Sequence, residues 1–347
     1  KALKKTRNIM LRTIKSIKNS YFVIFFLTFL LFNFKTANGE TIYNGTLIDA
    51  HSQVGILISN EEVSKEINNN DVYLTLLSMR GKHQNATKRY KSIQKQTQGK
   101  VRYLISTKLK GFARKNKDAN EAIRGINELK RQAVNSKINY VGFGEIIVQH
   151  APHDHEKLKY AGINLNLKSY RIKKAIDIVF KDDVPVILHV ELNDYEEDSK
   201  KILDQLVEIG NEHPNKIFLL MHMAQIEFKE AKFILKNTKN VHFITSHSDP
   251  YRAKNEKRKR LGKAQTGWIT LFNKKDNLKK KWITLMNENP NRFVFAIDNV
   301  FDHHWKKNYK ERVYFWRKAL ASLNENTASL IACGNANAYF KLKIQCK

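Results

Sequence analysis

The sequence predicts an α/β protein built as a (β/α)8 TIM barrel, and three observations lead to that prediction. After about residue 40, short runs of Val, Ile, Leu, Phe and Tyr alternate with longer amphipathic runs, as expected when strands alternate with helices. The apolar runs are nearly continuous, which is typical of parallel strands buried on both faces. Five of them end close to His51, Glu145, His189, His222 or Asp298, and the carboxyl ends of all barrel strands open onto one face.

The expected elements follow in order along the chain. The strands are expected at 45–50, 71–78, 101–106, 139–147, 184–191, 216–222, 241–246 and 292–298. The clearest helical runs are 119–136, 169–181, 196–212 and 227–237. In the third of these runs, Ile202, Leu206 and Ile209 recur at helical spacing. Residues 79–100 are only weakly helical, so a loop is the alternative there.

An open, doubly wound sheet is the alternative architecture. No GxGxxG or GxxxxGK[ST] pattern follows the first strand, so the usual nucleotide-binding signatures of that fold are missing. The chain has 347 residues, of which 42% are hydrophobic, and this is enough for one large barrel. Because no low-complexity linker interrupts the sequence, we expect a single domain over residues 40–347.

The amino-terminal segment has the order of a secretory signal peptide. Residues 1–20 carry seven basic side chains and no acidic one, residues 21–34 are apolar, and the small residues Ala37 and Gly39 follow. The apolar stretch is short for a membrane span, which needs about 20 residues. We therefore expect residues 1–39 to direct export, to the periplasm or the medium. An uncleaved anchor is the alternative, and it would be the protein's only link to a membrane.

The chain is strongly basic, with a formal net charge of +29. A nucleic-acid footprint is normally a localised patch or motif, whereas the Lys and Arg residues here are spread along the sequence. No nucleic-acid partner is therefore expected, although a basic, exported binding protein stays an alternative. The two cysteines, Cys333 and Cys346, are too few for a disulfide framework and could form a single bond near the C-terminus.

His189 is the strongest single candidate for a metal ligand. It follows the most hydrophobic run of the chain, in VPVILHVEL, and neutral imidazole is a common zinc ligand. Glu191 lies two residues further and thus on the same side of an extended strand, where it could accept a hydrogen bond from the ring or contact substrate. His51 stands just past the first strand, but two positions on is Gln53, a neutral amide that binds zinc poorly.

Carboxylates and further polar residues complete the predicted site. Glu145 lies inside the apolar run YVGFGEI, where an unpaired carboxylate is costly, so we expect it to be a metal ligand. Asp298 ends the last strand and is expected to bind the metal and to act as general base toward an activated water. His222 is expected to bind a second ion or to polarise a substrate carbonyl. Arg80 and His247 follow the second and seventh strands, where we expect substrate contacts, with Arg80 holding an anionic group.

The order of these motifs resembles the amidohydrolase superfamily, in particular its amidohydrolase-related branch. The segments that carry the resemblance are LIDAHSQ, YVGFGEI, PVILHVE, LLMHM, FVFAIDN and the closing CGNANAYFKL. The resemblance implies a distorted (β/α)8 barrel with one or two divalent metal ions, usually zinc. It also implies hydrolysis of an amide, ester, lactone or similar bond in a small molecule, or less commonly a decarboxylation without oxidation.

Carried over position by position, the resemblance makes His51 and His189 metal ligands and Asp298 both ligand and base. Glu145 takes the fourth-strand position where some relatives bridge two ions, and His222 is catalytic or binds a second ion. Gln53 departs from the family pattern, which has His at that position. One ion is therefore expected rather than two, and a degenerate barrel that binds a ligand without turning it over is the alternative. The substrate and the oligomeric state are left open.

Overall fold

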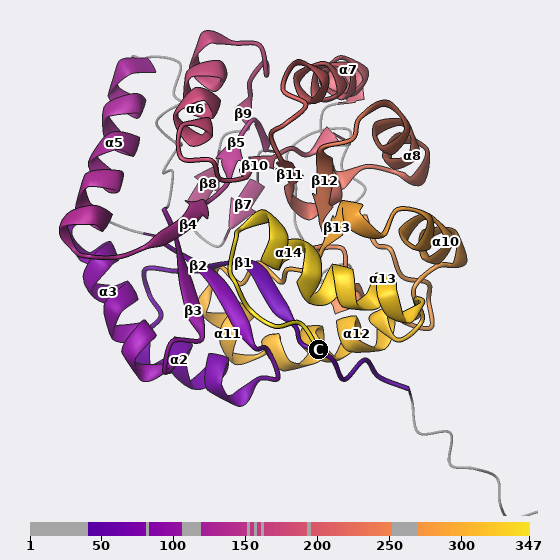
Figure 1. Ribbon diagram of the computed structural model, residues 1–347, viewed down its shortest axis with the longest axis horizontal. Helices are drawn as coiled ribbons and strands as arrows, with labels where there is room; N and C mark the ends of the chain where they lie inside the picture. Colours follow the sequence, from indigo (N-terminus) through magenta and orange to yellow (C-terminus); the bar gives the residue numbers. More distant parts are fainter. Residues whose placement is uncertain are drawn as a thin grey trace, which may run out of the picture. The chain divides into compact units, whose positions relative to one another are not determined.

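The computed structural model of the protein (Figure 1) describes residues 41–80, 83–105, 119–150, 153–155, 158–160, 163–192, 196–251 and 269–347. Residues Ile42–Lys347 form one compact unit. The predicted signal peptide, residues 1–39, lies outside the described residues, so export stays a prediction. In the part of the chain that is described, no helix combines the length and the apolar character that crossing a membrane requires.

All eight predicted strands are present. They are β1 (Ile48–Val54), β2 (Leu74–Met79), β3 (Val101–Ile105), β4 (Tyr140–Phe143) followed by β5 (Ile146–Ile147), β10 (Val186–His189), β11 (Phe218–Leu220), β12 (Val241–Ile244) and β13 (Phe293–Val294). Among the described residues between β5 and the next helix, four short strands form two antiparallel pairs. These strands are β6 (Gln149–His150) with β9 (Ile163–Asn164), and β7 (His153–His155) with β8 (Leu158–Tyr160).

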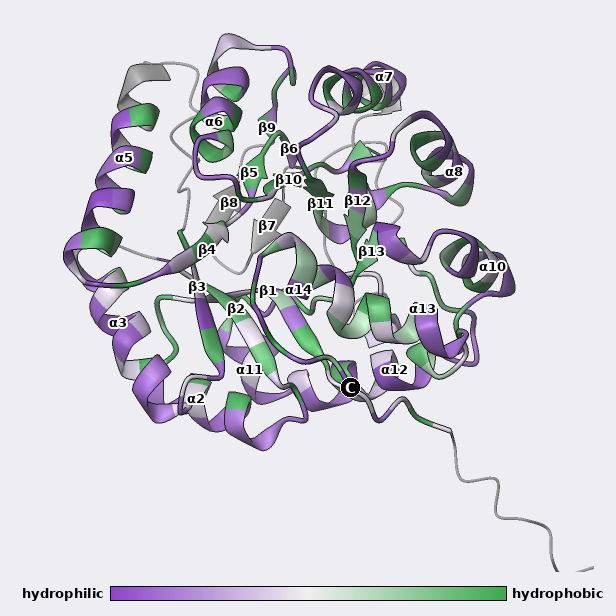
Figure 2. Cartoon of the chain, viewed as in Figure 1, coloured by the Kyte–Doolittle hydropathy of each residue, from purple (hydrophilic) through white to green (hydrophobic). Residues whose placement is uncertain are grey.

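The helices that alternate with the strands lie outside the ring of strands (Figure 1). Those between strands are α2 (Asn60–Asn69), α3 (His83–Gln96), α5 (Ala119–Asn135), α6 (Tyr170–Phe180), α7 (Glu196–Glu212), α8 (Phe228–Asn237) and α10 (Lys280–Glu288), with the short helices η2 (Met221–Gln225) and η3 (Pro290–Arg292). Those after the last strand are α11 (Asp302–Lys306), α12 (Tyr309–Leu320), α13 (Glu325–Ser329), η4 (Leu330–Gly334) and α14 (Asn335–Tyr339). Figure 2 shows hydrophobic colours on β5, β11 and β12 and mixed colours on α5, α7 and α8, as expected for buried strands under amphipathic helices.

Parallel pairing closes the strands into a barrel. One sheet has the order β1-β2-β3-β4 and the other β13-β12-β11-β10-β5, and they join where β4 pairs with β3 and β5 pairs with β10. At the other edge, the chain just after β13 pairs with β1. There, the N–H of Ala50 donates to the oxygen of Phe295 at 3.1 Å, and the N–H of Asp298 donates to the oxygen of His51 at 2.8 Å. The predicted (β/α)8 architecture is therefore confirmed.

The first strand lies later in the sequence than predicted. It begins at Ile48 and ends at Val54, so His51 lies inside the strand and the prediction that it follows the strand was wrong. The apolar run ends before His51, yet the ladder continues, because Gln53 pairs with Ser78 of β2. Backbone hydrogen bonding to β2 thus extends β1 through polar residues. A hydrophobicity pattern alone does not reveal this part of the strand.

The weakly helical run 79–100 contains a full helix, α3, so the loop alternative there is excluded. Its buried side chains Ala86, Tyr90 and Ile93 recur at intervals of four and three residues, which places them on one face. Polar residues around this narrow apolar stripe hid the helical pattern in the sequence.

The C-terminal segment covers the amino-terminal end of the barrel interior. Ala336 and Phe340 pack with inward-facing strand residues such as Leu76 and Leu219 in one buried cluster. Asn335 fixes this segment to the barrel, because its side-chain amide donates to the main-chain oxygen of Phe293 at 2.7 Å. The motif at 333–342 therefore covers the amino-terminal end of the barrel interior. The candidate site lies at the opposite, carboxyl end of the strands.

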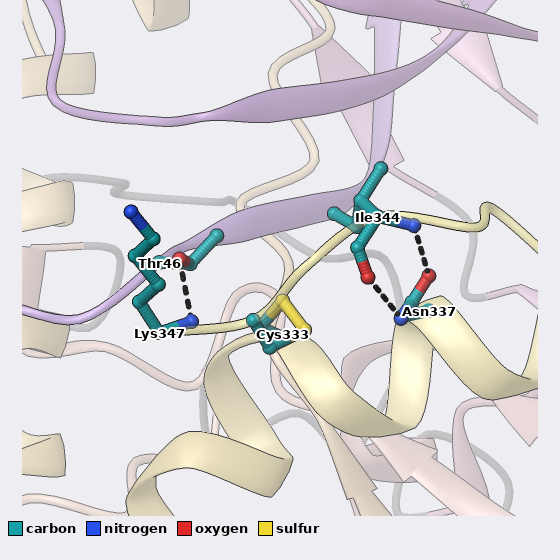
Figure 3. Close-up of a disulfide and its surroundings, with 6 residues drawn as sticks. Thr46, Cys333, Asn337, Ile344 and Lys347 are labelled. Atoms are coloured by element: carbon teal, nitrogen blue, oxygen red, sulfur yellow. Dashed lines mark hydrogen bonds between the residues drawn. A yellow bond between two sulfur atoms is a disulfide. The ribbon is translucent and has the colours of Figure 1, made fainter.

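A disulfide ties the end of the chain to this covering segment. Cys333 and Cys346 are bonded, with Cα atoms 5.8 Å apart. Figure 3 shows Lys347 beside Thr46, whose side-chain oxygen accepts a hydrogen bond from the N–H of Lys347 at 3.0 Å. The same figure shows Asn337 hydrogen-bonded to the main chain of Ile344. The last residues are thus held to the segment that leads into β1.

Candidate metal centre at the carboxyl end of the barrel

Every residue predicted for the site lies at or just after the carboxyl end of a barrel strand, except His51, which lies in the middle of β1. These residues are His51 in β1, Arg80 directly after β2, Glu145 between β4 and β5, His189 and Glu191 at the end of β10, His222 in η2 after β11, His247 after β12 and Asp298 after β13. Except for Arg80, they form one continuous set of side-chain contacts. The closed ladder explains this convergence, because parallel strands bring all their carboxyl ends to one face.

Asp298 connects the first strand with the sixth and seventh strands of the barrel. Its Oδ1 lies 3.1 Å from Nδ1 of His51 and accepts a hydrogen bond from the side-chain amide of Gln53 at 3.1 Å. Its Oδ2 lies 3.3 Å from Nε2 of His247 and 3.7 Å from Nε2 of His222. One carboxylate oxygen therefore faces β1, and the other faces two imidazoles.

His189 lies between two carboxylates. Its Nδ1 is 2.7 Å from Oε2 of Glu145, and its Nε2 is 2.9 Å from Oε1 of Glu191. Burial alone would lower the pKa of His189, but the two carboxylates outweigh it and raise that pKa to about 10. Burial would likewise raise the pKa of Glu145, whereas the charge and hydrogen bond of His189 lower it to about 2. The predicted contact between Glu191 and the His189 ring is therefore present.

His222 and His247 form a second part of the cluster. Their rings stack with centroids 4.1 Å apart and planes 2° from parallel. Nδ1 of His222 lies 3.0 Å from the hydroxyl of Ser246, so its Nε2 is directed toward Asp298. His247 lies within reach of a carboxylate and another imidazole, and its expected contact with substrate stays a prediction. Both histidines are buried.

The spacing of these side chains suits a metal ion. Among the described residues, three groups bring their ligand atoms within 4.8 Å of one another, namely Glu145–His189–His222, His222–His247–Asp298 and His150–His189–Glu191. Imidazole nitrogen with carboxylate oxygen is a donor set that zinc accepts. His51 belongs to none of these groups, yet its buried Nε2 has no hydrogen-bond partner in the described part of the chain. A buried polar atom without a partner is uncommon in a folded protein, and a cation site beside it fits that observation.

Arg80 lies apart from this contact network. Its guanidinium is 5.7 Å from the centre of the Phe301 ring, and it lines a surface cavity of about 460 Å³ with Ile56, Leu57 and Arg89. Arg89 holds the loop after β1 in place, because its guanidinium donates to the main-chain oxygens of Gly55 and Ile58. The role of Arg80 as a clamp for an anionic substrate stays a prediction.

Sequence reasoning missed two residues that support the site. Ser246 orients His222, and only its position just after an apolar strand could have drawn attention to it. Asp49 is fully buried in β1, and its Oδ1 accepts a hydrogen bond from the N–H of Ile297 at 2.8 Å. It thereby fixes β1 to the strand that carries Asp298. An acidic residue inside the apolar run LIDA was the available signal.

Comparison with known proteins shows a shared fold. No family model matches the chain, and no curated protein matches it by sequence. Solved structures do match it. An uncharacterised TIM-barrel protein from Bordetella bronchiseptica aligns with a TM-score of 0.52 at 10% identity, over 85% of this chain and 98% of that one. A dihydroorotase aligns with a TM-score of 0.52 at 9% identity, over 87% of this chain and 74% of that one.

A third solved structure is similar to the same extent. The phosphotriesterase homology protein of Escherichia coli, which holds phosphate in its active site, aligns with a TM-score of 0.50 at 9% identity. The alignment covers 87% of this chain and 99% of that one. At such identities these likenesses show the fold. Fold and site together define a parallel barrel with a buried cluster of imidazoles and carboxylates at its carboxyl end.

Proposed function

We propose that the chain is a metal-dependent hydrolase of the amidohydrolase superfamily that acts on an amide, ester or lactone bond of a small molecule. One observation carries this proposal: imidazoles and carboxylates from widely separated strands meet with metal-ligand spacing at the carboxyl end of the barrel. Barrel enzymes place their chemistry at this face. The similarity in fold to a dihydroorotase and to a phosphotriesterase homology protein supports the same class.

The cluster offers the groups that such a reaction needs. A bound divalent ion, zinc by its donor set, would supply Lewis acidity toward a carbonyl and toward water. Asp298, which lies among three histidines, would take the proton of the attacking water as general base. His222, held through its Nδ1 by Ser246, would direct its Nε2 toward the carbonyl oxygen, where charge develops during attack.

Gln53 supports a second candidate function, a degenerate barrel that binds a ligand without hydrolysing it. Its amide donates hydrogen bonds to Asp298 and to Glu145, at a position where the family pattern expects a metal-binding His. Elemental analysis of the purified protein separates the two functions. Close to one zinc ion per chain, with activity on a panel of lactones, esters and N-acyl compounds that chelation abolishes, supports the hydrolase. Absence of metal at micromolar zinc, together with retained ligand binding, supports the degenerate barrel.

We also propose that the protein works in an oxidising compartment, either the periplasm or the medium. The disulfide between Cys333 and Cys346 supports this, because such bonds are rare in the reducing cytoplasm, and so does the signal-like order of residues 1–39. Alkylation of free thiols in intact cells, followed by mass spectrometry, tests it. Protection of both cysteines from alkylation is expected, and alkylation of most of the protein would contradict the proposal.

A further inference from the structure

We propose that Arg312, a buried residue of α12, is a positioning residue that fixes how Asp298 and His247 approach each other. This inference rests on the proposed function, because Asp298 is the general base of that proposal. Arg312 acts through two residues beside them in the chain, Ile297 and Asp249.

The guanidinium of Arg312 joins the segments that follow the last two strands of the barrel. Its Nε donates to Oδ2 of Asp249 at 2.9 Å, and its Nη2 donates to the main-chain oxygen of Ile297. Asp249 comes two residues after His247, and Ile297 comes directly before Asp298. A guanidinium is planar and presents its donors at fixed angles. One side chain therefore sets the separation of the two segments.

The peptide group that leads into Asp298 is held at both of its polar atoms. Its oxygen, that of Ile297, accepts the hydrogen bond from Arg312. Its N–H, that of Asp298, donates to the main-chain oxygen of His51 at 2.8 Å. Loss of the contact with Arg312 would free one side of this peptide and let the carboxylate of Asp298 move.

Backbone conformation at both ends of this link needs such support. His247 and Asp298 have φ angles of 58° and 55°, in the left-handed region that residues with a Cβ seldom adopt. Residues persist in such conformations only where the surrounding structure holds them. The two contacts of Arg312 lie within two residues of these positions, so they are placed to hold both.

Stability alone does not explain a buried ion pair at this place. The side chains of Arg312 and Asp249 are 1% and 0% exposed. Removing two charges from water offsets much of their attraction, and apolar residues of similar volume often replace such pairs without loss of stability. In addition, Nη1 of Arg312 is buried without a hydrogen-bond partner in the described part of the chain, which is itself unfavourable. The geometry that the pair imposes is therefore the better explanation.

Arg317 provides a matched control on the same helix. It is also buried, and its guanidinium donates to the main-chain oxygens of Tyr43 and Gly45 and pairs with Asp71 at 2.8 Å. These three residues precede β1 and β2, at the amino-terminal end of the barrel. Arg317 thus makes the same kinds of contact as Arg312, but away from the candidate site.

The double variant Asp249→Leu with Arg312→Met tests the inference, since it removes both charges and leaves no unpaired ion. It is expected to fold, as circular dichroism and urea unfolding would establish. At saturating zinc its kcat is expected to fall about 10²-fold, the loss that a displacement of about 1 Å can cause, while its KM stays close to that of wild type. Arg317→Met should keep both constants. Arg312→Lys, which keeps a charge but cannot match the planar fork of Arg, takes the place of the double variant if that variant does not fold.

Nuclear magnetic resonance of the histidine rings in the metal-free proteins gives a second readout that does not depend on activity. The ring signals of His51 and His247, which both contact Asp298, should shift in the double variant and stay at their wild-type positions in Arg317→Met. A residue that only stabilised the fold would lower the free energy of unfolding and leave these signals and kcat unchanged.

The two proposals can fail separately. Wild-type kcat or wild-type ring signals in the folded variant of Arg312 would overturn the positioning role and leave the hydrolase proposal intact. A wild-type protein without hydrolytic activity would overturn the proposed function, and with it the catalytic purpose of Arg312. The ring signals would then still decide whether Arg312 sets the approach of His247 to Asp298.

Discussion

The side-chain amide of Gln53 donates a hydrogen bond to Oδ1 of Asp298 at 3.1 Å and thereby joins β1 to the last strand of the barrel. The same nitrogen lies 3.3 Å from Oε1 of Glu145. A neutral donor thus stands between two carboxylates, each of which would be a ligand in a two-metal site. Gln53 therefore donates hydrogen bonds to both carboxylates from one amide nitrogen and joins two acids of the cluster.

Replacing Gln53 by His should create a second metal site. The new imidazole would lie beside His51 and Asp298, which already contact each other, and would complete a donor set that zinc accepts. Zinc content measured by mass spectrometry is expected to rise from close to one ion per chain toward two. Gln53→Leu, which removes the amide without adding a ligand, should show no such rise. An unchanged zinc content in folded Gln53→His would mean that the position lies too far from its neighbours to bind metal.

Replacing Asp298 by Asn should abolish most of the activity. Asn retains a side-chain oxygen but cannot accept the proton of the attacking water, and general-base catalysis typically contributes about 10²–10⁴-fold to the rate. We expect a loss of this size in kcat at saturating zinc, measured on whichever substrate the screen identifies. Asp302→Asn, which alters a partly exposed carboxylate paired with Lys306, is the control and should keep its activity. Comparable activity in Asp298→Asn would assign the base to another residue.

The stability of the metal-free protein should depend on the ionisation of Asp49. Burial raises the pKa of Asp49 to about 6, against about 3.9 in an unfolded chain. Between these two values the folded state binds more protons than the unfolded state, so the free energy of unfolding falls as the pH rises through this window. Two pKa units correspond to about 3 kcal/mol.

Asp49→Asn removes this titration and leaves the other groups in place. In urea unfolding of the chelated proteins, wild type should therefore lose about 2 kcal/mol relative to Asp49→Asn between pH 4 and pH 6.5, because the rest of the full difference is already lost below pH 4. Because both proteins share every other titrating group, the difference between them isolates Asp49. A difference that stays constant over this range would show that the carboxyl does not titrate there.

Strand positions were predictable because both faces of each strand are buried. Continuous apolar runs such as that of β10, in which all four residues are buried, predicted the strands of the barrel. The first strand was misplaced because Ser52 and Gln53 continue the ladder with polar side chains. Hydrophobicity reports burial among apolar groups, whereas these residues are buried among other polar groups of the site.

The convergence of the site was also predictable, but its detailed pairing was not. Strand ends of a parallel barrel must share one face, so His189 and Asp298 were expected near a common centre. Which histidine approaches which carboxylate depends on local backbone conformation, such as the positive φ of His222 and His247. No sequence pattern predicts those angles. The sequence therefore predicted a substrate contact for His247 but not its approach to Asp298.

Breaking the disulfide should destabilise the fold without affecting the metal cluster. Cys333 and Cys346 are separated by 13 positions in the sequence, and closing a loop of about this length stabilises a protein by about 2–4 kcal/mol, in part by restricting the unfolded chain. The free energy of unfolding of Cys346→Ser, measured in urea, should therefore be lower than that of wild type by about 2–4 kcal/mol. Its zinc content should stay that of wild type. A reducing agent should lower the stability of wild type to the level of Cys346→Ser and leave the variant unchanged. If reduction shifts both proteins equally, or neither, the bond between these two cysteines does not contribute to the stability of the barrel.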